Sequence, residues 1–558
     1  MKKKWVLAAP HPEAAKLASE FKIHPVIASI ILRRGLKDSS EVLNFLNPSI
    51  EKLEDPFVFS DMRKAVDRIK KAISGKERVL VYGDYDVDGI TGSAILYPAL
   101  KRMGADVEVH IPHRIEEGYG LNEETLKTLL KKKFSLVITV DNGITGVSQI
   151  DYLRSRGADT IIVDHHTPKE TIPAAYAIVS AAIDGKGDPN LAACGLAFKL
   201  AWALLGDFKA VEEYLDLVTV GTVADIAPVL GDNRIILKHG LSALAKTKRV
   251  GLRALMQAAR MSIKNLSYRD IAFGIGPRIN ASGRMGSPEN AFKLLTTDNE
   301  LLAQNLAQLL DDGNRDRQRA EAAALEEAVE KVEESYFAAT EEVLVLESPD
   351  WHEGVLGIVA SRLVERYGKP AIVISLKEAT GKGSGRSLPN FSLFDCVVKC
   401  EDLLMNFGGH AQALGLTIQR DKISHFRNRL NEAVKSHKEI SSFEHEVVIN
   451  AEIALRDLDL RFLKELDSLS PFGPGNPKPL FISRGLKIKG EARKRGQDTL
   501  HAWVTDEASR TTCEMIGFRA FGRWVQRGKP ERLDLIYQPA LKEYNGVTSI
   551  ELQLEDWK

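Results

Sequence analysis

The sequence predicts a multidomain α/β protein: a parallel-sheet domain, a long connecting helix, a second α/β domain and a C-terminal β-barrel. Two observations lead to this fold class. Strand-like and helix-like segments alternate in two separate regions of the chain, and roughly the last hundred residues alternate apolar and polar side chains with a period of two. With 558 residues the chain is too long for a single core, and we expect three or four domains.

The first α/β domain is predicted over residues 79–230, after an N-terminal helical region over residues 1–78. Strand-like apolar runs alternate with helical segments: strands at 79–83, 107–111, 136–140 and 160–163, and helices such as Ile90–Met103 and Glu123–Lys132. This alternation is typical of βαβ units, in which the helices cross over between parallel strands. The sequence therefore predicts a parallel sheet.

Residues 231–335 are predicted to be helical and to end in a long connecting helix. The stretch Asn299–Ser335 contains no proline and one glycine, Gly313. Its leucines fall on one helical face: Leu302, Leu306, Leu309 and Leu310. One continuous helix and two helices broken at Asp311–Asn314 both agree with this pattern.

The second α/β domain is predicted over residues 336–440 and the barrel over residues 441–558. The former begins with the strand-like run 342–348, followed by a helix at Gly357–Arg366 and a strand at 371–375. In the latter, apolar and polar residues alternate on both sides of Asn545-Gly546, a dipeptide typical of tight hairpin turns. A small closed barrel is the expected result.

Composition limits the class of protein. The 76 basic and 76 acidic residues cancel, which argues against a protein that coats nucleic acid through its overall charge but leaves room for a local basic channel. We find no apolar run near the roughly 18 residues of a membrane span, and the basic start lacks the apolar core of a signal peptide. Four scattered cysteines do not make a disulfide framework, and Cys396 and Cys400 are expected to be buried free thiols. We expect a cytoplasmic protein.

Acidic residues and histidines follow three of the predicted strands. Asp84, Asp86 and Asp88 follow the first, Asp141 follows the third, and Asp164-His165-His166 follow the fourth. At alternate positions the first three acids share one side of an extended chain, and Gly89 permits a tight turn after them. In parallel sheets ligands bind at the carboxyl ends of the strands. Carboxylates mixed with imidazoles suit manganese or magnesium.

Simpler interpretations exist for the same residues. A solvated acidic loop, or a helix cap at Asp88, accounts for the first segment taken alone. Asp225 lies among apolar neighbours in GTVADIAP (221–228), where a buried carboxylate needs a partner or a metal. A helix cap is again the alternative.

GDYDVDG, VDNG, DHH and GTVADIAP, in this order, resemble the four motifs of the DHH phosphoesterase superfamily. Further segments resemble the RecJ family of single-stranded-DNA exonucleases: FGIGPRINASGR (273–284), WHEGVLGIVASRL (351–363), GSGRS (383–387), GGHAQALG (408–415) and PFGPGNPKPLF (471–481). The resemblance implies a DHH domain, a joining helical segment, a DHHA1 domain and an OB-fold.

The resemblance also implies the roles of site residues. Asp86 and Asp88 take the positions of first-motif metal ligands, Asp141 bridges two divalent cations, Mn²⁺ or Mg²⁺, and His165 and Asp225 complete the second site. Asp164 orients a ligand, and His166 acts at the scissile phosphate. Tyr82 stands where many relatives have a histidine, and Asp84 is the candidate for the missing ligand. Two such ions activate water, so no side-chain nucleophile is required.

Substrate-binding candidates lie mainly in the later motifs. They are basic, hydroxyl-bearing, aromatic or glycine residues suited to gripping phosphates and stacking bases: Arg114, Tyr119, Arg278, Asn280, Ser282, Arg284, Ser384, Arg386, Gly408, Gly409 and His410, the last expected to point inward. For each one, a structural ion pair or a packing role is the alternative. In the barrel, Arg493-Lys494-Arg495 with His501 and Trp503 is either a single-strand groove or a solvated hairpin.

The expected function is metal-dependent 5′→3′ degradation of single-stranded DNA to 5′ mononucleotides, in recombination and repair. The expected partners are single-stranded DNA, a single-strand-binding protein and a helicase, with a monomeric enzyme and no membrane. A DHH phosphoesterase acting on oligoribonucleotides, cyclic dinucleotides or pyrophosphate is the second hypothesis, but such enzymes look shorter. A non-catalytic DHH relative that serves as a replication scaffold is the third, but those lose the acidic motifs.

Overall fold

The structure is a computed structural model that describes residues 3–114, 116–264, 266–334, 340–436, 445–528, 530–544 and 547–558. The chain forms two compact units. Unit 1 comprises residues 54–227 and 231–443, and unit 2 comprises residues 2–53, 228–230 and 444–558.

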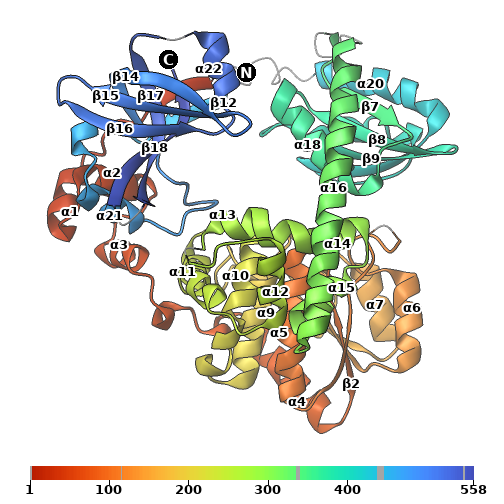
Figure 1. Cartoon of the computed structure of the whole chain (residues 1–558). Coiled ribbons are helices and arrows are strands. Elements are labelled where there is room, and N and C mark those ends of the chain that lie inside the picture. Colours follow the sequence, from red (N-terminus) through yellow and green to blue (C-terminus); the bar gives the residue numbers. More distant parts are fainter. Residues whose placement is uncertain are drawn as a thin grey trace. The chain divides into compact units, whose positions relative to one another are not determined.

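The first sheet of unit 1, whose strand β2 is labelled in Figure 1, is parallel throughout, in the order β3-β2-β4-β5-β6. Its strands are β2 (Arg78–Tyr82), β3 (Asp106–His110), β4 (Leu136–Val140), β5 (Asp159–Val163) and β6 (Ala177–Val179). Four of them lie within one residue of the predicted positions, because continuous apolar runs are typical of strands buried on both faces. The short β6 was not predicted.

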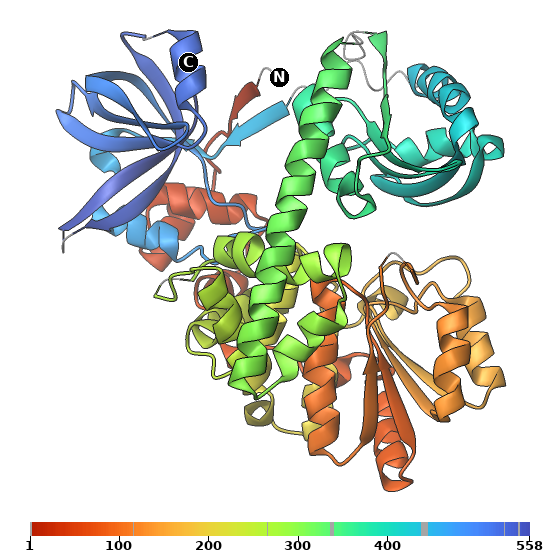
Figure 2. The same cartoon turned by 45° about the vertical axis from the view of Figure 1, so that its right-hand side comes forward.

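Helices cover both faces of this sheet (Figure 2). On one face α6 (Glu123–Leu129) and α7 (Val147–Ser155) bury Leu126 and Leu153 against Leu80 of β2. On the other face lie α5 (Val87–Arg102) and α9 (Ala193–Leu205), together with α4 (Met62–Ser74). All five residues of β4 are buried as a result.

A helical region follows the sheet and ends in one long helix. Its elements are α8 (Ala181–Asp184), α10 (Leu215–Ala224), α11 (Gly231–Ala245), α12 (Val250–Ala258), α13 (Tyr268–Asp270), a π-helix (Ile271–Ile275), α14 (Gly276–Met285), α15 (Glu289–Thr296) and α16 (Glu300–Glu334). Because α16 is continuous, the alternative of two helices broken near Gly313 is wrong. Leu306 and Leu310 are buried, whereas Leu302 and Leu309 are 43% and 52% exposed, so the buried face is completed by alanines instead.

The second sheet of unit 1 is mixed, in the order β10-β11-β9-β8-β7. Its strands are β7 (Leu344–Ser348), β8 (Ala371–Lys377), β9 (Thr380–Arg386), β10 (Leu404–His410) and β11 (Ala413–Gln419). The end of α16 and α18 (Leu356–Tyr367) share one hydrophobic core with this sheet. A second core contains α19 (Leu393–Val398) and α20 (Ile423–Lys435).

Unit 2 contains the predicted OB-fold, a closed five-stranded barrel. Strands pair in the order β14 (Phe481–Arg495), β15 (Thr499–Asp506), β16 (Thr511–Gly517), β18 (Val547–Trp557) and β17 (Leu533–Tyr544), and β17 returns to pair with β14. The short β13 (Ala451–Glu452), α21 (Leu460–Asp467) and α22 (Phe521–Arg527) accompany the barrel. The predicted turn at Asn545-Gly546 lies outside the described residues, although β17 and β18 pair antiparallel on either side of it.

The N-terminal segment belongs to the same unit as the barrel. Strand β1 (Lys3–Leu7) pairs in parallel with β12 (His445–Ile449). Helices α1 (Ala14–Phe21), α2 (Pro25–Arg33) and α3 (Ser39–Leu46) share a hydrophobic core with α21 and the barrel strands. The sequence predicts only helices here, because a strand whose partner is hundreds of residues away has no local signature.

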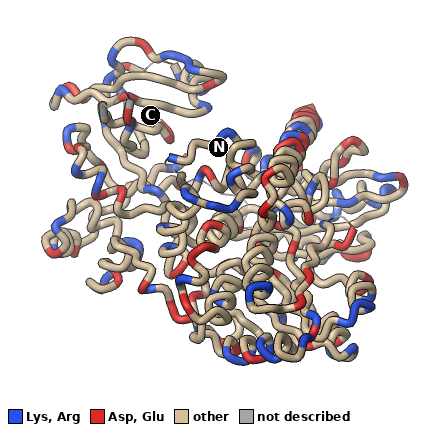
Figure 3. Tube along the Cα trace, turned by 60° about the horizontal axis from the view of Figure 1, so that its bottom comes forward, with Lys and Arg blue, Asp and Glu red and all other residues tan. Residues whose placement is uncertain are grey.

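The remaining composition-based expectations concern cysteines, charge and membranes. All four cysteines are buried and free, as predicted for Cys396 and Cys400. Basic and acidic residues are interspersed along the trace in the view of Figure 3. Among the described residues, no helix combines the length and apolarity needed to cross a membrane.

Candidate active site

The segment after β2 brings three carboxylates to the start of α5. Asp86 caps this helix, because its Oδ1 accepts the N–H groups of Asp88 (2.9 Å) and Gly89 (3.2 Å). Gly89 is therefore helical and does not form the predicted turn. Its role is close approach, since a Cβ on residue 89 would lie 2.5 Å from the backbone nitrogen of Asp84.

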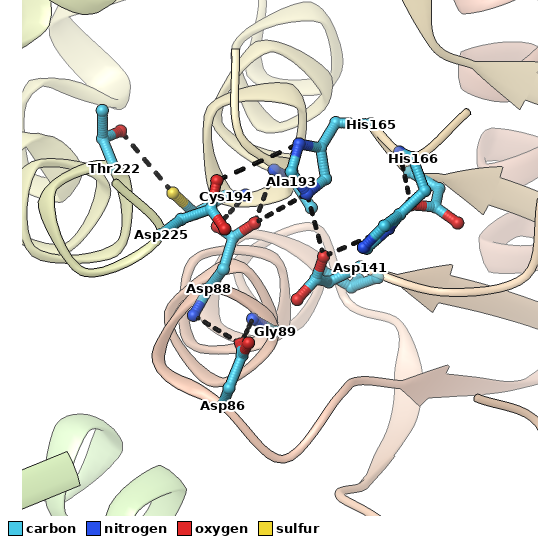
Figure 4. Close-up of polar contacts among 12 residues, drawn as sticks. Asp86, Asp88, Gly89, Asp141, His165, His166, Ala193, Cys194, Thr222 and Asp225 are labelled. Carbon is cyan, nitrogen blue, oxygen red and sulfur yellow. Dashed lines mark hydrogen bonds and ion pairs between the residues drawn. The ribbon is translucent and has the colours of Figure 1, made fainter. Parts of the chain in front are cut away.

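Asp88 is held from the other side by the N-terminus of α9. Its two carboxylate oxygens accept the N–H groups of Ala193 and Cys194, both at 2.8 Å (Figure 4). Helix N-termini favour negative charge at this position. The sequence does not predict this contact, because backbone amides leave no side-chain signature. The only local signal is the run of small residues at the start of α9.

Asp141 follows β4 in a left-handed conformation with φ 65°. Few residues other than glycine adopt this conformation, and it is common at functional sites. The next residue, Asn142, fixes the strand ends, because its Nδ2 donates to the carbonyls of Tyr82 (3.3 Å) and Val140 (2.9 Å). The carboxylate of Asp141 is thereby brought to the acids that follow β2.

The ligand-type residues form two linked groups, each with its donor atoms within 4.8 Å of one another: Asp84, Asp86 and Asp141, and Asp88, His165 and Asp225. A third set within the same limit, Asp141, His165 and His166, overlaps both groups. His165 Nε2 lies 3.4 Å from Asp141 Oδ1, which connects the groups, and 3.8 Å from Asp88 Oδ2 (Figure 4). His165 Nδ1 lies 4.0 Å from Asp225 Oδ2. Asp84, Asp86 and Asp88 do not share one side, because α5 begins at Val87 and turns Asp88 toward the second group.

The electrostatics of these groups favour bound cations. Burial and the charges of neighbouring aspartates raise the pKa of Asp84 and of Asp141 well above the ordinary range. Burial and the charges of Asp88 and Asp86 raise the pKa of Asp225 to about 9. One buried oxygen of Asp84 and one of Asp141 lack a hydrogen-bond partner among the described residues. Hard oxygen ligands with a histidine fit Mn²⁺ or Mg²⁺, and a divalent cation would satisfy both oxygens.

His166 overlaps the two groups through Asp141 and His165 and is oriented by Asp164. Its Nδ1 is 2.7 Å from Asp164 Oδ1, and its backbone N–H donates to the same oxygen at 3.1 Å. The backbone N–H of Ile144 donates to the other oxygen of Asp164 at 3.0 Å. Burial alone would raise the pKa of Asp164, but the contacts with His166 and Ile144 outweigh it and lower this pKa. Asp164 is thus a fixed partner that holds the His166 ring.

Tyr82 has no place in either group. It is fully buried, and its ring belongs to the hydrophobic core beneath α6, where its hydroxyl contacts the carbonyl of Gly120 at 3.4 Å. Asp84 instead joins Asp86 and Asp141.

The loop between β3 and α6 carries Arg114 and Tyr119 toward the site. Tyr119 Oη lies 3.2 Å from His166 Nδ1. Glu117 holds the loop, since its carboxylate accepts the His113 N–H (2.7 Å) and the Thr125 hydroxyl (2.6 Å). Burial would raise the pKa of Glu117, but these bonds and a contact with His110 lower it to about 2. The sequence analysis missed Glu117, because an acid among neighbouring acids in a loop has no distinctive pattern.

Three of the predicted phosphate-binding arginines lie near one another within unit 1. Burial, followed by the charges of Arg114 and other arginines including Arg386, lowers the pKa of Arg284 to about 9. Burial and the charge of Arg114 likewise lower the pKa of Arg386. Arg284 Nη1 donates to the carbonyl of Gly354 (3.0 Å), and Arg386 Nη1 donates to Ser384 Oγ (3.1 Å). None of the three forms an ion pair with a described carboxylate, so this arginine cluster can accept an anion.

Other predicted substrate-binding residues are placed differently. Arg278 forms an ion pair with buried Asp311 at 2.8 Å. Ser282 Oγ donates to the carbonyl of Ile279 in its own helix (2.6 Å), and Asn280 lies half-buried on that helix. Gly408, Gly409 and His410 are exposed at the end of β10. A strand at the edge of its sheet leaves these residues open to solvent.

The barrel of unit 2 exposes part of its predicted basic patch. Arg493, Lys494 and Arg495 are exposed, and Trp503 is 45% exposed. His501 is buried and lies 2.7 Å from Glu514 Oε1, so it has a structural partner instead of a free ring.

Three family descriptions match the chain. The DHH family, N-terminal domain, matches residues 78–222, the DHHA1 domain matches residues 340–436, and the RecJ OB domain matches residues 449–556. The acids that follow β2 and β4, and both histidines, fall within the first match.

Individual relatives match over the whole chain. The single-stranded-DNA-specific exonuclease RecJ of Bacillus subtilis (strain 168) is 34% identical, and the match covers 100% of this chain and 71% of the relative. The crystal structure of RecJ in complex with Mn²⁺ from Thermus thermophilus matches with a TM-score of 0.85 and 30% identity, covering 100% of this chain and 79% of that one. The corresponding complex with Mg²⁺ matches with a TM-score of 0.79 and 28% identity, covering 100% and 78%. The chain therefore belongs to the RecJ family of DHH-domain proteins.

Proposed function

We propose that this protein degrades single-stranded DNA from the 5′ end and releases 5′ mononucleotides. The observation that carries the proposal is the pair of linked ligand groups around Asp141 and His165, in the same unit as a cluster of arginines that form no ion pair with any carboxylate that the structure describes. RecJ relatives are named as single-stranded-DNA-specific exonucleases. The direction is the one that the family resemblance implies.

In this proposal Asp84, Asp86 and Asp141 would hold one divalent cation, and Asp88, His165 and Asp225 would hold the other. Cations held there would supply the Lewis acidity that polarises a phosphodiester and activates water. The arginine cluster of Arg114, Arg284 and Arg386 binds phosphate, because guanidinium groups match phosphate oxygens in paired hydrogen bonds.

His166 is the proposed donor to the leaving 3′ oxygen. Asp164 holds its Nδ1 at 2.7 Å, so we assign the substrate to Nε2, which lies 3.4 Å from the Tyr119 hydroxyl. Tyr119, whose hydroxyl lies near both ring nitrogens, is placed to contact the nucleotide at the same point.

The test is digestion of 5′-labelled and 3′-labelled single strands in Mn²⁺ and in Mg²⁺, with duplex and RNA controls. We expect early release of labelled mononucleotide from the 5′-labelled strand only. Early release from the 3′-labelled strand would overturn the direction, and equal digestion of a blunt duplex would overturn the single-strand preference. Asp141→Ala should abolish cleavage while single-strand binding stays measurable; activity within tenfold of wild type would contradict the two-cation arrangement.

A small-substrate phosphodiesterase remains the second candidate. The match of residues 449–556 to the RecJ OB domain favours a long strand as substrate. Faster hydrolysis of cyclic dinucleotides or pyrophosphate than of DNA would favour the alternative. The proposal also includes a monomeric enzyme in the cytoplasm that works with a single-strand-binding protein and a helicase.

A further inference from the structure

Phe273 is an aromatic side chain that the proposed chemistry does not use. It is 73% exposed, more than any other described large hydrophobic residue. It occupies the middle of the π-helix Ile271–Ile275, directly before α14. A single exposed hydrophobic residue is ordinary on a protein surface, but the surroundings of Phe273 set it apart.

The sequence accounts for the irregular helix. Pro277 has no N–H group, so the carbonyl of Phe273, four residues earlier, cannot have its α-helical partner. The next carbonyl, of Gly274, accepts a hydrogen bond from Arg278 Nη1 at 2.7 Å. Arg278 is in turn fixed by buried Asp311 of α16. Segments of π-helix are frequent at functional sites, and here a partly buried ion pair holds one in place.

The same segment packs against the turn that carries the ligand-type residue Asp225. Tyr268 Oη donates to the carbonyl of Val223 at 3.2 Å. A Cβ on Gly276 would lie 3.4 Å from the Cβ of Ala224. The π-helix and α14 both contact α10, which ends at Ala224, and α13 lies next to α10 in Figure 1. Phe273 is therefore presented from a segment that adjoins the second ligand group.

Ile226, directly after Asp225, is a second unexplained apolar residue. It is 67% exposed, and its φ is 62°. A β-branched residue in the left-handed region is an outlier that costs free energy. Neither packing nor backbone preference accounts for an isoleucine here, whereas contact with a ligand would.

We propose that Phe273 stacks on a base of the bound strand next to the cation site, and that Ile226 extends this apolar platform. The inference rests on the proposed function and adds a base-binding position to it. Arg269 supports it: its guanidinium lies 5.7 Å from the Phe273 ring centroid and forms no ion pair with a described residue, so it is free to contact the adjoining phosphate. An aromatic ring beside a cation is the combination that single-strand grooves use. Arg278 acts as a positioning residue and does not contact phosphate.

The test compares Phe273→Ala, Phe273→Leu and Phe273→Trp. With a long single strand, the alanine variant should raise KM by about 5- to 100-fold, the usual effect of losing one stacked base, with a smaller change in kcat. The increase in KM of the alanine variant should be smaller with the p-nitrophenyl ester of thymidine 5′-phosphate, which has no downstream strand. Leu309→Ala, which removes an exposed leucine from α16, is the matched control and should behave as wild type.

A direct readout uses strands with 2-aminopurine at successive positions, bound to Asp141→Ala protein so that no cleavage occurs. One position should be quenched by stacking. Phe273→Ala should relieve this quenching and Phe273→Trp should restore it, whereas Phe273→Leu should not. Arg278→Lys should mimic Phe273→Ala without reducing the salt dependence of binding, because no phosphate contact is lost.

The outcomes separate this inference from the proposed function. Unchanged KM and unchanged quenching in Phe273→Ala, with an active wild type, would overturn the platform alone. If Phe273→Leu kept the wild-type KM and the wild-type quenching, an apolar contact without stacking would be sufficient, and the stacking proposal would be overturned. A wild type that degrades no single strand would overturn the proposed function itself.

Discussion

Gly89→Ala should disable the site without removing any functional group. Gly89 lies in the first turn of α5, where a Cβ would sit 2.5 Å from the Asp84 nitrogen and 2.7 Å from the Asp84 Cα. These atoms belong to the backbone and cannot rotate away, so the start of α5 must separate from Asp84. The change therefore separates two ligand groups, since Asp84 belongs to one and Asp88, on α5, to the other.

The geometry gives the expected magnitude. Ordinary van der Waals contact begins near 3.4 Å, so a contact of 2.5 Å requires a shift of about 1 Å. A misplacement of that size costs roughly 10²-fold in activity. Overpacking a buried position costs about 1–3 kcal/mol of unfolding free energy.

Gly313→Ala is the matched control, because it makes the same chemical change in the middle of α16. A Cβ there meets nothing within 4 Å, so the helix should gain about 0.5–1 kcal/mol from the better helix former. For both variants, urea unfolding measures the free energy of unfolding, calorimetric titration measures the affinity for Mn²⁺, and digestion of single strands measures activity. Gly89→Ala with Mn²⁺ affinity and cleavage within threefold of wild type would refute the reasoning, whatever its stability.

Three further predictions follow from the contacts of the site and the core. His166→Ala should slow cleavage by roughly 10²–10⁴ with near-normal metal content, whereas His165→Ala should lose metal as well; equal metal loss in both would contradict this division. The pKa of Glu117 is lowered to about 2 from an ordinary 4.5. The ionised carboxylate therefore adds at most about 3 kcal/mol to the free energy of unfolding. This contribution is present above pH 4.5 and is lost as the pH falls toward 2. Unfolding free energies of wild type and Glu117→Gln should therefore differ at pH 7 and converge near pH 2, and a constant difference would refute this pH dependence. Deleting residues 445–558 alone should cause aggregation, because helices within residues 1–53 lose their core partners. Deleting residues 1–53 together with residues 445–558 should leave a monodisperse protein. Light scattering that finds more aggregation in the double deletion than in the single deletion would refute the shared core.

Much of the fold is determined by local sequence. The apolar runs before Asp84, Asp141 and Asp164 are long enough and hydrophobic enough to predict buried parallel strands, so the order of elements follows without knowledge of their contacts. The acids and histidines at the strand ends indicate a candidate metal site, because hard ligands gathered at one edge of a sheet need cations to offset their repulsion.

Tertiary structure alone decided how those residues are grouped. Asp84 and Asp88 are four residues apart, but the helix that begins between them assigns them to different ligand groups. Arg278 looks like a phosphate contact in its motif and instead pairs with Asp311, 33 residues later. Strand β1 pairs with a segment more than 400 residues away. A sequence pattern shows which side chains an element offers, whereas the partner of each side chain depends on elements that only packing brings together.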